Sequence, residues 1–130
     1  MTTLNKNMRI LIVDDYSTML RILRNLLRQI DFMNVEEATD GEQAMLKLAA
    51  QSHDLIISDW NMKPMTGLDL LRKVRGDMRF KHIPFIMVTA ESKTENVVAA
   101  KQAGVSNYIV KPFNSETLKG KIMSVFGATS

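Results

Sequence analysis

The chain has 130 residues, a length that suits one domain with a single buried core. Hydrophobic residues make up 45% of the chain and charged residues 24%, which is typical of a soluble globular protein and excludes disorder and collagen-like repeats. The formal net charge of +3 is too small to indicate a particular class of partner.

The residue types also limit the chemistry and the location of the protein. The chain has no cysteine, which excludes disulfides, cysteine-ligated zinc and a thiol nucleophile. Its longest apolar runs have four residues, whereas a membrane span needs about 18. Residues 1–8 lack the apolar stretch of a secretory signal. We therefore expect a cytoplasmic protein that does not bind membranes.

Five short apolar runs recur along the chain, and several are continuous, as expected of strands covered on both faces. They lie at residues 10–13, 35–38, 55–57, 85–88 and 108–110. Between the first two runs, apolar residues from Met19 to Ile30 repeat with the helical period opposite a face of arginines. This pattern predicts an amphipathic helix of about three turns.

Start and stop signals place the other helices. Two capping-box spacings, Asp40–Gln43 and Ser92–Glu95, predict helix starts, and Gly104 predicts a helix end. A last helix is expected from about Ser115. The order βα, repeated five times, predicts an α/β fold with a doubly wound parallel sheet and helices on both faces. Residues 1–8 are expected to be a loose tail and residues 9–127 the domain, with no output domain attached.

Polar residues stand at the end of four of the five predicted strands. Asp14 and Asp15 follow the first run, Asp59 the third, Thr89 the fourth and Lys111 the fifth. One aspartate after a strand is usually a turn or cap residue. Because ligands of open parallel sheets bind beyond the carboxyl ends of the strands, agreement among four strands favours a shared site.

This set of residue types suits a phosphoryl group. Three crowded carboxylates repel one another unless a cation offsets their charge. Oxygen ligands with no histidine or cysteine nearby in the sequence favour Mg²⁺, which commonly bridges carboxylates to a phosphate. Lys111 would add a positive charge at a phosphoryl oxygen, and Thr89 a neutral hydrogen bond. We therefore expect one Mg²⁺ ion in the domain.

Four motifs carry a family resemblance that extends from residue 9 to residue 126. Asp14-Asp15, Ser58-Asp59, Val88-Thr89-Ala90 and Val110-Lys111-Pro112-Phe113, at their joint spacing, resemble the bacterial receiver domain of two-component signalling. Residues 15–19, 59–62 and 99–104 are most similar to the single-domain chemotaxis regulators of that family. The resemblance implies a flavodoxin-like fold with strand order 2-1-3-4-5.

The resemblance also implies how the site works. Asp59 would accept a phosphoryl group from the phosphohistidine of a partner kinase, so we expect a phosphoacceptor rather than an enzyme. Lys111 and Thr89 would contact the phosphoryl oxygens. The chemistry would then consist of positioning and charge neutralisation.

The metal and the lifetime of the phosphorylated state are assigned in the same way. Asp15, Asp59 and the backbone carbonyl of Asn61 would bind Mg²⁺, with Asp14 assisting. Asn61 and Glu91 would flank the approach of the water that removes the phosphoryl group, and so would modulate dephosphorylation.

The resemblance further implies a switch. Thr89 would move toward the phosphoryl group and Tyr108 would turn inward behind it, although an aromatic residue in a strand is by itself usually packing. The matched partner-binding face consists of Val97, Lys101, Tyr108, Asn114 and Lys121. Lysines at positions 101, 119 and 121 would make this face basic, which suits an acidic or amphipathic peptide.

The expected partners are a histidine kinase and a flagellar motor switch protein, with a phosphatase as a further candidate, and we expect a monomer. A stand-alone receiver that acts as a phosphate sink, a phosphorelay intermediate or a regulator of a non-flagellar target would have the same site. Binding of a flagellar switch peptide to the phosphorylated protein would separate these hypotheses.

Other classes fit the sequence less well. A haloacid-dehalogenase-type phosphohydrolase needs a second aspartate two residues after the first, where this chain has Tyr16. A nucleotide or flavin binder would have a glycine-rich loop in the first βα turn. A DNA-binding role would rest on a spaced arginine face, which is usually just solvated: Arg21, Arg24 and Arg28.

One stretch departs from the family pattern. Such receivers usually carry proline directly after the methionine of the Asp-Trp-Asn-Met stretch, whereas here Lys63 intervenes before Pro64. Lys63 adds a charge close to the site. His53 and His82 lie in predicted loops and are expected to be solvated, and the ten methionines are expected mainly to fill the core.

Overall fold

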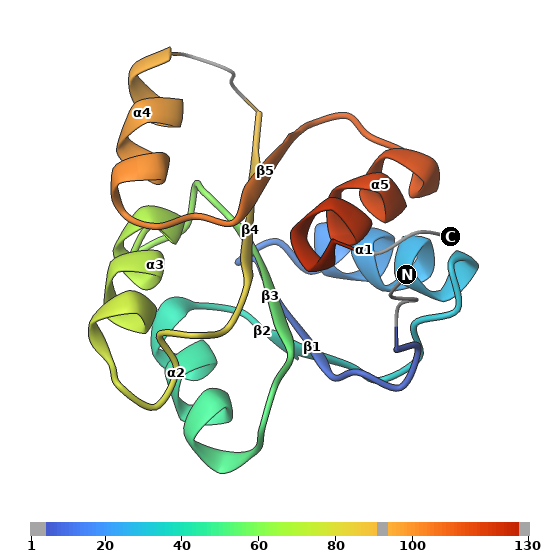
Figure 1. The fold of residues 1–130 in the computed structure, drawn as a ribbon, viewed down its shortest axis with the longest axis horizontal. Coiled ribbons are helices and arrows are strands. Elements are labelled where there is room, and N and C mark those ends of the chain that lie inside the picture. The colour runs from blue at the N-terminus through green and yellow to red at the C-terminus, as the bar shows by residue number, and fades with distance from the viewer. Residues whose placement is uncertain (1–4, 91–93, 128–130) are drawn as a thin grey trace.

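The computed structural model describes residues 5–90 and 94–127 and has the predicted α/β architecture (Figure 1). The strands are β1 (Ile10–Val13), β2 (Val35–Ala38), β3 (Leu55–Asp59), β4 (Phe85–Thr89) and β5 (Asn107–Val110). The helices are α1 (Ser17–Gln29), α2 (Gly41–Ala50), α3 (Gly67–Gly76), α4 (Thr94–Gln102) and α5 (Ser115–Phe126). All strand pairs are parallel, in the order β2-β1-β3-β4-β5, which confirms the expected fold.

Helices cover both faces of the sheet because each strand is apolar on both sides. Successive side chains of a strand point to opposite faces. Ile10 and Ile12 therefore belong to the core beneath α1 and α5, whereas Leu11 and Val13 belong to the core beneath α2 and α3. Figure 1 shows α1 and α5 on one side of the sheet and α2, α3 and α4 on the other.

Two strands end later than the sequence predicts, and this places two site residues inside the sheet. Asp59 is the last residue of β3 and pairs with Val88, while Thr89 is the last residue of β4 and pairs with Val110. Each residue is paired on one side only, Asp59 with β4 and Thr89 with β5. Their backbones are therefore fixed by the sheet.

Helix caps agree in part with the predicted signals. The Asp40 side chain accepts a hydrogen bond from Gln43 N at 2.7 Å, but the Gln43 side chain bonds to Thr39 N instead of closing the box. A complete capping box, not predicted, starts α3 at Thr66 and Asp69. The Ser92–Glu95 signal lies outside the residues whose side chains are described.

Two expectations about exposure are wrong. Residues 5–8 are not a loose tail: Met8 is buried in the core, and Lys6 Nζ donates to Ile30 O at 3.0 Å. His53 is buried rather than solvated, because its ring lies between the end of α2 and the edge strand β2. His82 is exposed, as expected. Among the described residues, no helix is long and apolar enough to cross a membrane.

Candidate functional site

The predicted site residues come together at the carboxyl edge of the sheet. Parallel register places the ends of β1, β3, β4 and β5 side by side. Two backbone hydrogen bonds fix the residues that follow these ends: Asp14 N donates to Ala38 O at 3.1 Å, and Lys111 N donates to Thr89 O at 2.8 Å. The site is therefore built on the sheet itself, with the loops supplying the remaining groups.

An ion pair joins the proposed acceptor to its predicted cation. Lys111 Nζ lies 2.8 Å from Asp59 Oδ1. The Asp59 side chain is 7% exposed, whereas the Lys111 side chain is 29% exposed. A buried carboxylate next to an ammonium group remains available as a nucleophile, because the cation offsets the cost of burying its charge.

Asp14 is the most perturbed acid at this edge. Its Oδ1 accepts a hydrogen bond from Tyr16 N at 3.0 Å, whereas its Oδ2 is buried and has no hydrogen-bond partner. The pKa of Asp14 is raised to about 6, mainly by burial and also by the nearby charges of Asp59 and Asp15, while the Tyr16 amide and Lys111 oppose the shift. An unpartnered buried carboxylate oxygen is uncommon in native proteins and calls for a cationic or donor partner.

The acidic residues fit a hard divalent cation only in combination with other oxygens. Within the described residues, no three acidic or histidine side chains lie together as a ready ligand set. Asp15 is exposed, unlike Asp14 and Asp59. The buried orphan oxygen of Asp14 and the adjacent Asp59 carboxylate nevertheless present the oxygen donors that Mg²⁺ prefers. A backbone carbonyl such as that of Asn61 would have to complete the set.

The β3–α3 loop that carries Asn61 is anchored at both ends. Trp60 N donates to Val88 O, and Gly67 N donates to Trp60 O, each at 2.8 Å. A Cβ atom on Gly67 would collide with the backbone carbonyl oxygen of Asp59, so this position has room only for glycine. The sequence prediction missed Gly67, and its only signal was a glycine at the start of a helix, where better helix formers are usual.

Comparison with known proteins identifies the family. The model of the response regulator receiver domain matches residues 10–123. The chain belongs to the receiver-domain family.

Relatives of this receiver domain include chemotaxis proteins. Chemotaxis protein CheY-3 of Vibrio cholerae is 53% identical over 123 residues, which cover 95% of each chain. Chemotaxis protein CheY of Pseudomonas aeruginosa is 54% identical over 119 residues, covering 92% of this chain and 96% of the relative. The chain is thus similar over nearly its whole length to CheY-type proteins.

Solved structures agree with this relationship. The structure of Vibrio cholerae CheY4 crystallised at low pH superposes with a TM-score of 0.86 at 34% identity and covers 92% of this chain and 98% of its own. The receiver domain of the sensor histidine kinase PA1611 from Pseudomonas aeruginosa superposes with a TM-score of 0.84 at 25% identity and covers 94% of this chain and 99% of its own. That structure has a magnesium ion coordinated in its active site cleft.

The predicted switch residues of the receiver lie next to each other. Thr89 is buried, Tyr108 is half-buried, and both line a narrow gap beneath α4 together with Trp60 and Val97. Lys121 Nζ lies 5.4 Å from the centre of the Tyr108 ring. Thr89 and Tyr108 are therefore close enough for a change at one to affect the other. The movement predicted for them stays a prediction.

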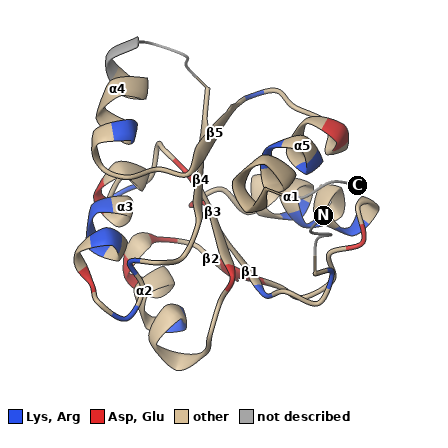
Figure 2. Cartoon of the chain, in the orientation of Figure 1, with Lys and Arg blue, Asp and Glu red and all other residues tan. Residues whose placement is uncertain are grey.

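The other predicted residues of the partner face are spread over α4 and α5. Lys101 is exposed, and Asn114 has a structural role as well, because its Oδ1 caps α5 by accepting from Thr117 N at 2.8 Å. Figure 2 shows basic residues on both helices. The predicted dephosphorylation residue Glu91 lies outside the described residues.

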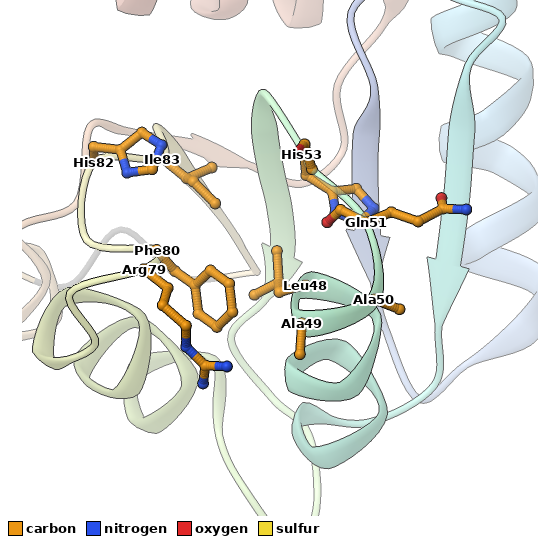
Figure 3. A pocket seen from close by; sticks show the side chains of 10 residues that line it. Leu48, Ala49, Ala50, Gln51, His53, Arg79, Phe80, His82 and Ile83 are labelled. Carbon is orange, nitrogen blue, oxygen red and sulfur yellow. The ribbon is translucent and has the colours of Figure 1, made fainter.

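A separate pocket of about 240 Å³ lies at the amino ends of the strands and contains none of the predicted site residues. Its walls come from the end of α2, from His53 and from Arg79, Phe80, His82 and Ile83 (Figure 3). Because His53 precedes β3, this pocket lies at the amino end of the strands, away from Asp59. It is not the site of the predicted phosphoryl chemistry.

Proposed function

We propose that this CheY-type receiver is a single-domain response regulator that accepts a phosphoryl group on Asp59 and carries a chemotaxis signal to the flagellar motor. The observation that carries the proposal is the buried Asp59 carboxylate, held 2.8 Å from Lys111 Nζ beside the unpartnered oxygen of Asp14. Structural aspartates at strand ends are normally satisfied by caps or turns. Asp14 makes such a bond with one oxygen only, and its other oxygen and Asp59 concentrate charge at an edge where ligands bind.

The transfer step would be a substitution at phosphorus. A carboxylate oxygen of Asp59 attacks the phosphorus of a phosphohistidine, the P–N bond breaks, and its electron pair leaves with the imidazole of the kinase. We expect Lys111 to pair with the negative charge on a phosphoryl oxygen and Thr89 to donate a hydrogen bond to another. Later attack by water on the acyl phosphate releases inorganic phosphate and restores Asp59. Asn61 and Glu91 are the residues we propose to influence that second step.

The metal proposal rests on the donor atoms of the site. Asp14, Asp59 and the backbone carbonyl of Asn61 would hold Mg²⁺, with exposed Asp15 completing the acidic cluster. Bound Mg²⁺ would supply positive charge that offsets the carboxylates and the incoming phosphoryl oxygens. The magnesium ion in the cleft of the PA1611 receiver supports this assignment.

The partners follow from the family and from the charge of the predicted face. A histidine kinase would donate the phosphoryl group, and a phosphatase is a further candidate partner. Lys101, Lys119 and Lys121 make the α4–β5–α5 face basic, which suits an acidic amphipathic segment of a flagellar motor switch protein. We propose that the protein acts as a monomer in the cytoplasm and is not an enzyme acting on a separate substrate.

The test uses the fluorescence of Trp60, which directly follows Asp59. We expect a saturable response to Mg²⁺, followed by a reversible response to acetyl phosphate that is lost in Asp59→Asn. Asp31→Asn, an exposed change between α1 and β2, is the matched control and should respond as the wild type does. Acid-labile phosphate that persists in Asp59→Asn would contradict the acceptor assignment.

The same phosphorylated protein tests the output. A peptide from a flagellar switch protein should bind phosphorylated wild type more tightly than Asp59→Asn. A protein that takes up phosphate normally but ignores the peptide would instead be a phosphate sink, a relay intermediate or a regulator of a non-flagellar target.

A further inference from the structure

The turn after β2 lies at the same edge of the sheet as the proposed phosphorylation site, yet it supplies no side chain to that site. Its Asp40 carboxylate is used to cap α2, and the next residue is Gly41, the first residue of that helix. Glycine is a poor helix former, and Gly41 does not have the positive φ angle that would require glycine. Another constraint must therefore explain glycine here.

That constraint is Met65, in the β3–α3 loop. A Cβ atom on Gly41 would overlap the Met65 sulfur and would lie 3.1 Å from both its Cγ and its Cε. The Met65 side chain thus rests directly on the Gly41 backbone. Because Cγ is also closer than an ordinary packing contact, a larger residue at 41 would displace the Met65 sulfur and press on Cγ, so that the Met65 side chain or its backbone would have to move.

Met65 belongs to the loop that carries Asn61. This loop is fixed at Trp60 and Gly67 by the two hydrogen bonds described above and at Met62, which is buried in the core beneath α2 and α3. Asn61 itself is exposed. The loop around Asn61 is thus held by Met62 in the core and by Met65 against the turn after β2.

Met65 also has space to move elsewhere. It borders a groove of about 390 Å³ between α2 and α3, which is also lined by Met45, Leu46 and Ala49. Its position over Gly41 is therefore not forced by lack of space but is allowed by the missing side chain at 41.

We propose that the contact between Met65 and Gly41 positions the β3–α3 loop so that the Asn61 carbonyl faces the cation held by Asp14 and Asp59. Met65 and Gly41 are positioning residues, since neither touches the reacting atoms. The inference rests on the proposed function and identifies how β2, the one strand with no side chain in the site, contributes to it.

The experiment is Gly41→Ala, studied first in the metal-free protein and then with Mg²⁺. Alanine favours the helix, so weakening of α2 is not the expected effect. We expect the backbone amide resonances of residues 60–64 to shift in the metal-free protein, and the Mg²⁺ affinity measured by Trp60 fluorescence to fall by roughly tenfold, as for other groups that orient metal ligands.

Two further variants make the test specific. Gly120→Ala, within α5, is the matched control, because a Cβ atom there would meet nothing within 4 Å, and it should leave the Mg²⁺ affinity unchanged. Met65→Ala removes the other partner and should also weaken Mg²⁺ binding. In that background Gly41→Ala should change the affinity by less than about twofold, because both changes act through one contact.

The contrary result is equally definite. If Gly41→Ala moves only the Met65 methyl resonance, and leaves both the amides of residues 60–64 and the Mg²⁺ affinity at wild-type values, Met65 has swung into the groove and the contact positions nothing. Should Gly41→Ala not fold, Met65→Ala with normal Mg²⁺ affinity would overturn the proposal. If the wild type does not bind Mg²⁺, the proposed function fails, and the amide shifts of metal-free Gly41→Ala still decide whether the contact positions the loop.

Discussion

At the scale of single residues, Asp14 is a buried acid of the candidate site whose ionisation lowers the stability of the fold. The residue is 2% exposed, and one of its carboxylate oxygens has no hydrogen-bond partner. Burial raises its pKa from 3.8 to about 6. Since the folded protein holds this proton more tightly than the unfolded chain does, the cost of ionising Asp14 is absent at low pH, grows between these two values and is complete above them.

We predict that Asp14→Asn stabilises the metal-free protein at neutral pH. The amide keeps an oxygen for Tyr16 N and carries no buried charge, so the free energy of unfolding should rise by up to about 3 kcal/mol at pH 7.5. Most of this gain should disappear by about pH 4.5, where wild-type Asp14 is already protonated in the folded state. Urea denaturation at the two pH values measures both effects.

Mg²⁺ and a second variant provide the controls for this prediction. Saturating Mg²⁺ should stabilise the wild type more than Asp14→Asn and so narrow the difference at neutral pH. Exposed Asp31→Asn should change stability by less than about 0.5 kcal/mol at either pH. A gain for Asp14→Asn that is the same at both pH values would mean that buried charge is not its cause.

At the scale of secondary-structure elements, Arg75 joins the end of α3 to the segment before β4 and to the turn after α4. From the end of α3, its Nε donates to Gly104 O at 2.8 Å, and its Nη1 donates to Lys81 O at 3.1 Å and to Ile83 O at 2.6 Å. Gly104 lies in the turn just after α4 and has a φ of 92°, a conformation that favours glycine and commonly ends a helix. Burial lowers the pKa of Arg75, and the three carbonyl groups supply hydrogen bonds to its partly desolvated guanidinium.

Arg75→Met should destabilise the fold by about 2–3 kcal/mol, because it keeps most of the apolar contact but leaves several carbonyl groups without donors. Arg75→Lys should recover part of the loss, since lysine has the charge but not the fork of donors. Chemical denaturation measures the change, with exposed Arg72→Met on the same helix as the control. Equal effects of Arg72→Met and Arg75→Met would show that the network contributes nothing specific.

At the scale of the whole molecule, the two edges of the sheet have different tasks. The carboxyl edge carries charged groups, and one of their buried oxygens has no hydrogen-bond partner. At the amino edge, the buried side chain of His53 is hydrogen-bonded at both ring nitrogens. There the buried His53 ring places Nδ1 3.1 Å from Gln51 O and Nε2 2.8 Å from Glu36 Oε1. Both ring nitrogens of this buried side chain therefore have an oxygen partner.

Glu36→Ala should therefore weaken the fold without affecting the proposed site. It leaves His53 Nε2 buried without its partner, which should lower the free energy of unfolding by about 1–3 kcal/mol. The Mg²⁺ affinity should stay within about twofold of wild type, because distant sites without shared partners act independently. Exposed Glu42→Ala on α2 is the control for removing a negative charge. A matching loss of Mg²⁺ affinity in Glu36→Ala alone would show that the two edges are coupled.

The sequence predicted the elements well because their signals are local. The helical repeat of α1 and the continuous apolar runs of the strands depend on residues only a few positions apart. The residue types at the carboxyl edge were also predicted, since a strand end can be recognised from its own run. The strand order came from the family resemblance rather than from any of these patterns.

Other features could not be predicted because they join segments that are distant in the sequence. His53 has the surroundings of a loop residue in sequence, but it is buried and its Nε2 pairs with Glu36 on β2. Gly41 and Met65 belong to different βα units, so nothing near either one reveals their contact. Likewise, the expected crowding of three aspartates was only partly realised, since Asp15 is exposed.

By itself, the sequence determined which elements form and which chemical groups stand at their ends, because hydrophobic periodicity and turn residues act over short stretches of chain. Only the tertiary structure decided which of those groups meet. Lys111 meets Asp59 and Met65 meets Gly41, whereas one buried oxygen of Asp14 meets no hydrogen-bond partner. These contacts depend on how separate elements pack across the sheet, and that packing sets the distances, burial and charge on which the proposed chemistry depends.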